Sequence, residues 1–112
     1  MSRLLRRLMD DRGVSQIELS GIADVSQSTI SLYLRGRRGT RINSQAAPTV
    51  RKLAKALGVS PTVFDEYRIY RIETLMRRHR GLLSTIEEVA LPIAQRSGWL
   101  AEFGGEEVDG AK

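Results

Sequence analysis

Residues 16–36, QIELSGIADVSQSTISLYLRG, constrain the fold more than any other stretch of this 112-residue chain. Ser15, just before the stretch, and Glu18 have the spacing of a capping box, in which each side chain bonds the backbone amide of the other residue. Apolar residues then recur at helical spacing, at Leu19, Ile22 and Ala23. The pattern ends at Asp24, a residue type that tolerates left-handed backbone. The sequence therefore predicts a short helix that starts at Ser15 and is followed by a tight turn.

A second short helix is predicted directly after this turn. Val25 is apolar and can fill the turn, and the hydroxyl of Ser26 can cap the next helix. One face of that helix has the i, i+3, i+4 spacing of a buried stripe and comprises Ile30, Tyr33 and Leu34. The opposite face consists mainly of amide and hydroxyl side chains and comprises Gln27, Ser28, Ser31 and Leu32, with Arg35 at its edge. Because amides and hydroxyls hydrogen-bond to base edges, this face suits the major groove of DNA.

The stretch resembles the helix-turn-helix of the phage-repressor-like family of bacterial regulators, the Cro/cI or xenobiotic-response-element (XRE) type. The positions that carry the resemblance are Gln16, Leu19, Ser20, Asp24, Val25, Ile30, Tyr33, Arg35 and Gly36. Two of them depart from the family pattern, since Ser20 stands where alanine is usual and Asp24 where glycine is usual. Serine is small enough for helix packing, and aspartate can make the turn. The resemblance implies that DNA is the partner and that Gln16 anchors the first motif helix to a phosphate.

The residues before the motif also have a helical pattern. The segment MSRLLRRLMDDRG is basic and has an apolar stripe that comprises Leu4, Leu5, Leu8 and Met9 and ends at Gly13. Such a start could mimic a transit peptide, but Asp10 and Asp11 follow at once. We therefore expect this segment to form the first helix of the domain.

Two further helices are predicted after the motif. Pro48 suits the first turn of one helix, whose apolar face comprises Val50, Leu53, Ala54 and Leu57 before Gly58 ends it. Ser60 and Pro61 repeat this opening for another helix, which contains Val63, Phe64 and Tyr67. The phrase VRKLAKALGVSPTVF resembles the fourth and fifth helices of the family, and the resemblance extends over roughly residues 3–67. It implies an all-α protein with a lambda-repressor-like five-helix DNA-binding domain at residues 1–67 and a C-terminal helical extension.

Positive charge is concentrated before residue 81 of this chain, whose net charge is +5. Residues 1–80 hold sixteen Lys or Arg against seven Asp or Glu, whereas residues 81–112 hold two against six. The loop after Gly36, RRGTRINSQAAP, is long for the family and contains three arginines and no acid, namely Arg37, Arg38 and Arg41. Such a loop suits contact with phosphates or entry of an arginine into the adjacent minor groove. The alternative is a flexible loop with incidental charge.

These patterns give a set of candidate DNA contacts. The base-reading candidates are Gln27, Ser28 and Ser31, with Thr29 and Leu32 as further candidates. Leu32 suits either a thymine methyl group or a neighbouring helix, and both remain open. Tyr33 is expected in the core, with a bond from its hydroxyl to a phosphate as the alternative. The phosphate candidates, which should make binding depend strongly on salt, are Gln16, Arg35, Arg37, Arg38 and Arg41.

Apolar residues beyond Tyr67 recur alternately three and four residues apart, which is the spacing of a heptad-like seam. The seam comprises Ile69, Ile72, Met76, His79, Leu83, Ile86, Ala90 and Ile93. Gly81 and Pro92 are expected to divide it into separate helices, with Ser84 and Glu87 as the capping box of the middle one. His79 is expected to be a packed or partly exposed residue of the seam rather than a ligand or a pH switch.

The seam predicts a helical dimerisation extension at residues 68–103. The residues expected at the dimer interface are Ile69, Ile72, Met76, Leu83, Ile86 and Ile93. Folding of the seam onto the DNA-binding domain is the alternative. The final segment, residues 104–112, is acidic and Gly-rich and is predicted to be disordered.

Together these features favour a sequence-specific transcriptional regulator, a repressor, that binds double-stranded DNA as a homodimer at the nucleoid in the cytoplasm. An antitoxin whose C-terminal helices bind a partner protein is the alternative. An enzyme is not expected, because the sequence has no nucleophile–base pair and no Gly-rich phosphate loop. No cofactor or metal is expected either, since the chain has no cysteine and one histidine. The sequence contains no apolar run of about 18 residues or more, so no membrane span is predicted.

Overall fold

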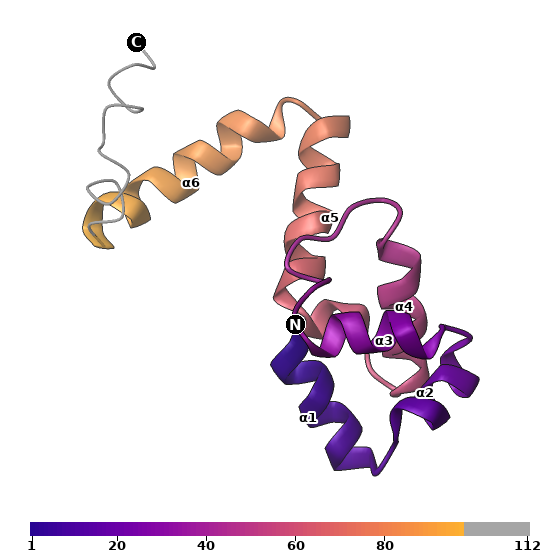
Figure 1. The fold of residues 1–112 in the computed structure, drawn as a ribbon. Helices are drawn as coiled ribbons and strands as arrows, with labels where there is room; N and C mark the ends of the chain where they lie inside the picture. The colour runs from indigo at the N-terminus through magenta and orange to yellow at the C-terminus, as the bar shows by residue number, and fades with distance from the viewer. Residues whose placement is uncertain (98–112) are drawn as a thin grey trace. The chain divides into compact units, whose positions relative to one another are not determined.

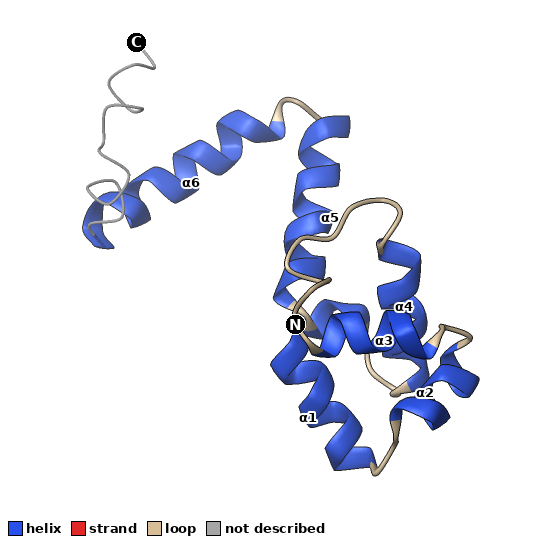
Figure 2. Ribbon diagram, viewed as in Figure 1, coloured by secondary structure: helices blue, strands red, loops and turns tan. Residues whose placement is uncertain are grey.

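The computed structural model describes the backbone of residues 1–97 and the side chains of residues 1–96. The predicted disordered tail, residues 104–112, therefore lies outside the described residues. Within the described part every element is helical and no strand is present (Figures 1 and 2), which confirms the all-α prediction. The elements are α1 (Ser2–Arg12), α2 (Gln16–Ala23), α3 (Gln27–Leu34), α4 (Ala47–Ala56), the 3₁₀ helix η1 (Pro61–Val63), α5 (Asp65–Arg78) and α6 (Leu82–Ser97). None of the described helices is long and apolar enough to cross a membrane.

The chain divides into two units, of which the first is Met1–Thr74 and the second begins at Leu75. In the first unit, α3 packs against α1 and α2, and α2 and η1 pack against α4 (Figure 1). Apolar side chains from all of these helices except η1 form the core, and the largest fully buried ones are Tyr33, Phe64, Leu5, Leu19, Ile30, Leu53, Leu57 and Val50. Burial of a side chain of this size contributes about 1.5–3 kcal/mol. The predicted core faces of the first, third and fourth helices are thereby confirmed.

The ends of α2 are those that the sequence predicts. The Glu18 amide donates to Ser15 Oγ and the Ser15 amide donates to Glu18 Oε1, both at 3.1 Å, so the capping box is present. The hydrogen bond from the Ser15 amide, and to a smaller extent the Ser15 hydroxyl, lowers the pKa of the Glu18 carboxyl. At the other end Asp24 adopts left-handed backbone, with φ 57° and ψ 48°. An aspartate thus makes the turn at the position where the family more often has glycine.

The sequence pattern groups Ile22 with the buried face of α2, and this prediction is wrong. Ile22 is 62% exposed, although the sequence pattern groups it with Leu19 and Ala23, which are both buried. Residues in a helix are turned by roughly 100° from one to the next, so Ile22 lies well to one side of the stripe formed by the other two. A helix of eight residues held between α3 and α4 buries only this narrow stripe.

The opening at Ser60 and Pro61 differs from the prediction. It forms the single 3₁₀ turn η1, after which Phe64 is extended, with φ −90° and ψ 122°. The regular helix α5 begins only at Asp65. Phe64 and Tyr67 are buried, but Val63 is exposed because the 3₁₀ turn leaves it outside the core. The α5 helix then continues past Tyr67 to Arg78 without a break.

The seam residues other than His79 lie on two helices, and the predicted interruption at Gly81 is confirmed. The α5 helix ends at Arg78 and α6 begins at Leu82. The interruption predicted at Pro92 is wrong, because this proline lies inside α6. Proline removes one backbone donor at a cost of about 3 kcal/mol, and here the helix continues through it. The predicted capping box of Ser84 and Glu87 is wrong as well, since Ser84 lies inside a helix that starts two residues earlier.

Candidate nucleic-acid interface

The α3 helix has one buried and one outward face. Ile30, Tyr33 and Leu34 are buried, as the sequence predicts. On the other side Gln27 and Ser28 are exposed, and the half-buried residues are Thr29, Ser31 and Leu32. Every base-reading candidate therefore lies at least partly accessible on the helix that the motif places second.

The hydroxyl groups at the start of α3 form a local cluster. Ser26 Oγ accepts from the Thr29 amide at 3.2 Å and donates to Thr29 Oγ1 at 2.8 Å. Ser28 Oγ lies 3.1 Å from the same Ser26 oxygen. The predicted cap at Ser26 is confirmed, and it also engages two of the base-reading candidates. The side chains of Gln27 and Ser31 have no hydrogen bond within the described part of the chain, so the polar atoms of these two candidates stay available.

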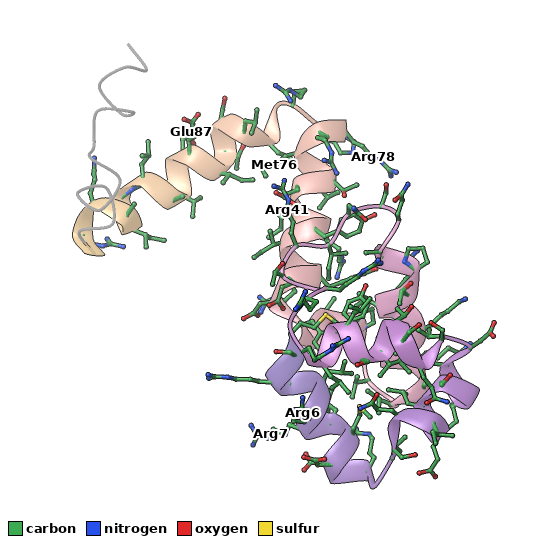
Figure 3. The ribbon with its side chains drawn as sticks, in the orientation of Figure 1. Arg6, Arg7, Arg41, Met76, Arg78 and Glu87 are labelled. Carbon is green, nitrogen blue, oxygen red and sulfur yellow. The ribbon has the colours of Figure 1, made fainter. Side chains whose placement is uncertain are left out.

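Two side chains hold α3 in place by bonds that the sequence pattern does not indicate. Ser20 Oγ donates to the carbonyl oxygen of Val25 at 2.6 Å and so fixes the turn between α2 and α3. Arg6, which Figure 3 shows on α1, donates from Nη2 to the carbonyl oxygen of Leu34 at 3.1 Å. The Ser20 bond depends on serine at a position where the family usually has alanine, which is the only signal that could have indicated it. The Arg6 bond has no comparable signal, because charged residues are common on exposed helix faces.

Two further phosphate candidates flank the motif. Gln16 is exposed at the first residue of α2. Arg35 is exposed at the end of α3, where its Nε donates to the carbonyl oxygen of Ser31 at 3.4 Å. Both side chains therefore reach solvent from the ends of the two motif helices.

The basic loop, residues 35–46, is packed against the domain. Its first part turns back on α3, because the amides of Arg37 and Arg38 both donate to the carbonyl oxygen of Leu32, at 2.9 and 3.2 Å. Gly39 is buried with φ 87°, and a Cβ atom there would lie 2.9 Å from Cδ1 of Tyr33. Ile42 is only 3% exposed and belongs to the core. The loop is thus anchored to α3 and to the core at these positions.

The loop arginines differ in their partners. Arg41 lies beside α5 (Figure 3), with Nη2 3.4 Å from Oε2 of Glu73. The Arg41 side chain is 80% exposed, so this ion pair contributes little to stability. Arg37 and Arg38 are exposed and have no carboxylate partner among the described residues.

A hollow of about 300 Å³ lies between this loop and the start of α4. Its lining is mainly polar, and among the described residues it includes no carboxylate. The residues of the lining that could bind an anion are Tyr33, Arg37, Arg38, Thr40, Arg41, Asn43 and Thr49. Burial raises the pKa of the Tyr33 hydroxyl, and the positive charge of Arg38 opposes this only in part, so the phenol stays protonated at neutral pH.

The seam residues leave a large apolar area accessible. In the first unit Ile69 and Ile72 are about half exposed, at 56% and 49%. In the second unit Leu83, Ile86 and Ile93 are exposed and Met76 is half-buried. Two exposed apolar residues that the seam pattern omits, Leu75 and Val89, add to it. His79 is exposed, and no group of three or more acidic or histidine residues in the described part could hold a metal ion.

The geometry of α2, the Asp24 turn and α3 defines a helix-turn-helix domain. A family model described as a helix-turn-helix domain matches residues 1–67. Because this match covers more than half of the sequence, the chain belongs to that helix-turn-helix family. Searches of curated proteins and of solved structures gave no match.

Proposed function

We propose that this protein is a sequence-specific transcriptional regulator of the phage-repressor-like (Cro/cI, XRE) type, which represses by inserting α3 into the major groove of DNA. The observation that supports this most is the accessible amide and hydroxyl face of α3 beside a packed loop rich in arginine. An exposed helix without a DNA partner would more commonly carry Glu and Lys pairs. No catalytic role is proposed, and the protein acts at the nucleoid in the cytoplasm.

The proposed contacts fall into two groups with different effects. The base-reading group is led by Gln27, whose amide suits the N6 and N7 edge of adenine, and includes Ser28, Ser31, Thr29 and Leu32. The phosphate group comprises Gln16, Arg35, Arg37, Arg38 and Arg41. The first group discriminates between sequences, whereas the second sets affinity and its dependence on salt.

The protein is proposed to bind as a homodimer through the seam. The side chains of α5 and α6 that support this are the exposed Ile69, Ile72, Leu83, Ile86 and Ile93 and the half-buried Met76. Exposed apolar side chains at heptad-like spacing gain free energy when a second copy covers them. Two-fold symmetry then presents two α3 helices to two half-sites.

The same exposed seam supports one alternative. An antitoxin would bind DNA through residues 1–67 and a partner protein through α5 and α6, and its seam would be covered by that partner instead of by a second copy. Sedimentation of the purified full chain distinguishes the two: a stable dimer in the absence of other proteins favours the regulator, and a monomer favours the alternative.

The proposed function is tested by selection of random duplex DNA with the purified full chain, followed by sequencing. We expect an inverted repeat whose half-sites lie roughly one helical turn apart, about 10 base pairs from centre to centre. Placing that repeat over a promoter should lower reporter expression when the protein is present. Recovery of DNA without any shared sequence would contradict a sequence-specific regulator.

A further inference from the structure

The hollow beside the basic loop has the composition of an anion site. Three arginines line it, and the polar groups of Thr40, Asn43 and Thr49 supply further hydrogen-bonding atoms. Its volume of about 300 Å³ is at the small end of the range for ligand pockets, ~300–1,000 Å³. Guanidinium groups are suited to phosphate because each offers several donors in a planar fork. The hollow has room for a phosphate group, and its positive charge favours an anion.

The walls of the hollow are held in place before any ligand arrives. The amides of Arg37 and Arg38 are both bonded to the Leu32 carbonyl oxygen, so the loop leaves α3 in a fixed direction. The buried side chain of Ile42 anchors its second half. Asn43 Oδ1 accepts from the amides of Gln45 and Ala46, at 3.1 and 2.8 Å, and thereby fixes the approach to α4.

Gly39 is the position on which this arrangement most depends. Its φ of 87° favours glycine, and an added Cβ would come within 2.9 Å of the Tyr33 ring and 3.0 Å of Met1 Sδ. Tyr33 is only 1% exposed, so its ring cannot move aside without disturbing the core. Glycine here lets the backbone lie directly against the Tyr33 ring. Arg38 precedes Gly39 directly and Arg41 follows two residues later, so the position of Gly39 sets where both arginines begin.

Arg41 is paired with Glu73 of α5. The distance of 3.4 Å between Nη2 and Oε2 orients its guanidinium group, while most of the side chain stays exposed. This carboxylate belongs to α5 and is not part of the lining of the hollow. The wall of the hollow includes no carboxylate among the described residues, so the charges of Arg37 and Arg38 are not balanced there, whereas the charge of Arg41 is partly balanced by Glu73.

We propose that the loop forms a preorganised phosphate-binding pocket, in which Arg37, Arg38 and Arg41 bind one phosphate group and Gly39 is a positioning residue. One source of this phosphate group is the DNA backbone of the operator, and that part of the proposal rests on the proposed function. The other source is a free phosphorylated ligand, which would then compete with DNA and regulate binding. Both sources share the same chemistry and are separated by experiment.

The first arm titrates the full chain with inorganic pyrophosphate at constant ionic strength and follows backbone amide shifts by NMR. Saturable shifts centred on residues 37–49 support a free-ligand site if the affinity obtained from them falls roughly tenfold in Arg38→Gln. Gly39→Ala should weaken them as much although it removes no charge. The matched controls are Arg68→Gln, an exposed arginine outside the hollow, and Gly58→Ala, which has a similar φ of 73° but no atom within 4 Å of the added Cβ.

The second arm replaces single phosphates of the selected operator with neutral methylphosphonates. If neutralising one phosphate per half-site lowers the operator affinity of the wild type roughly tenfold, and does not lower the affinity of Arg38→Gln any further, the DNA source is supported. If neither pyrophosphate nor any single phosphate gives an effect that depends on Arg38, the pocket is overturned while a selected operator leaves the proposed function standing. If pyrophosphate saturates the pocket but no DNA sequence is selected, the pocket stands and the proposed function fails. Should Gly39→Ala not fold, Arg38→Gln alone decides each arm.

Discussion

Single side chains in this protein have separable effects on local structure and on DNA affinity. Ser15 caps α2 and is not among the proposed DNA contacts, whereas Arg38 is exposed on the basic loop with no carboxylate partner among the described residues. A substitution at the first position should therefore change stability, and one at the second should change binding.

Ser15→Ala removes the hydroxyl that accepts from the Glu18 amide, and we expect the free energy of unfolding to fall by about 1 kcal/mol. Denaturant unfolding of the full chain measures this. Ser84→Ala is the control, since Ser84 is exposed inside α6 and does not cap it, and its effect should stay within about 0.5 kcal/mol. Equal losses from both variants would mean that the capping box contributes nothing.

Arg38→Ala should weaken binding to specific and unrelated duplexes alike, because a phosphate contact carries no sequence information. The slope of log affinity against log salt concentration should fall in magnitude by about 1. Fluorescence anisotropy at several salt concentrations measures both quantities. With Arg68→Ala, which removes an exposed arginine on α5, the slope should remain as in the wild type; a slope unchanged by Arg38→Ala would remove this residue from the interface.

At the scale of elements, the helices with strong local signals were predictable and the long-range contacts were not. The capping box at Ser15, the Asp24 turn and the cap at Ser26 all depend on residues within a few positions of one another, so spacing alone indicates them. The pattern failed for Ile22, because the width of a buried stripe depends on which neighbours a helix has. It also failed at Pro92, since one missing backbone bond did not outweigh the continuation of the helix on both sides.

The candidate site shows the same division. The outward face of α3 follows from its 3.6-residue period, and its base-reading candidates are all at least partly accessible. The order of the basic loop could not be predicted, because Gly39 and Ile42 acquire their roles only through contacts with Tyr33 and the core. The bond from Arg6 to Leu34 joins residues 28 positions apart, and no local pattern indicates such a pair.

Ile42→Ala tests whether the loop acts as an ordered element. Truncating this buried side chain should destabilise the domain by about 2–5 kcal/mol, because it leaves a cavity in the core. Under conditions where the variant remains folded, operator affinity should also fall, because the loop arginines lose their fixed positions. Calorimetric unfolding together with anisotropy measures the two effects, and full operator affinity in a destabilised variant would show that loop order is not needed for binding.

In the proposed dimer, the seam face of α6 is buried against the second copy, so a charge introduced there should weaken self-association. Ile86→Asp should weaken self-association at least tenfold, because a buried unpaired carboxylate is costly. Ser84→Asp adds the same charge nearly on the opposite side of α6, since residues two apart in a helix are turned by roughly 200°, and should leave the dimer intact. Sedimentation equilibrium of the full chain measures both. If Ile86→Asp dimerises as well as the wild type, the seam on α6 is not the interface.

Recognition of DNA through α3 is tested most directly by repeating the selection of random duplexes with Gln27→Ala. We expect the variant to select the wild-type inverted repeat, but with the preference lost at one base pair in each half-site. The lost discrimination at that base pair should be about 1–3 kcal/mol, and the preference at the other positions should be unchanged. An identical sequence preference in the wild type and the variant, or an equal loss of affinity for every sequence, would contradict it.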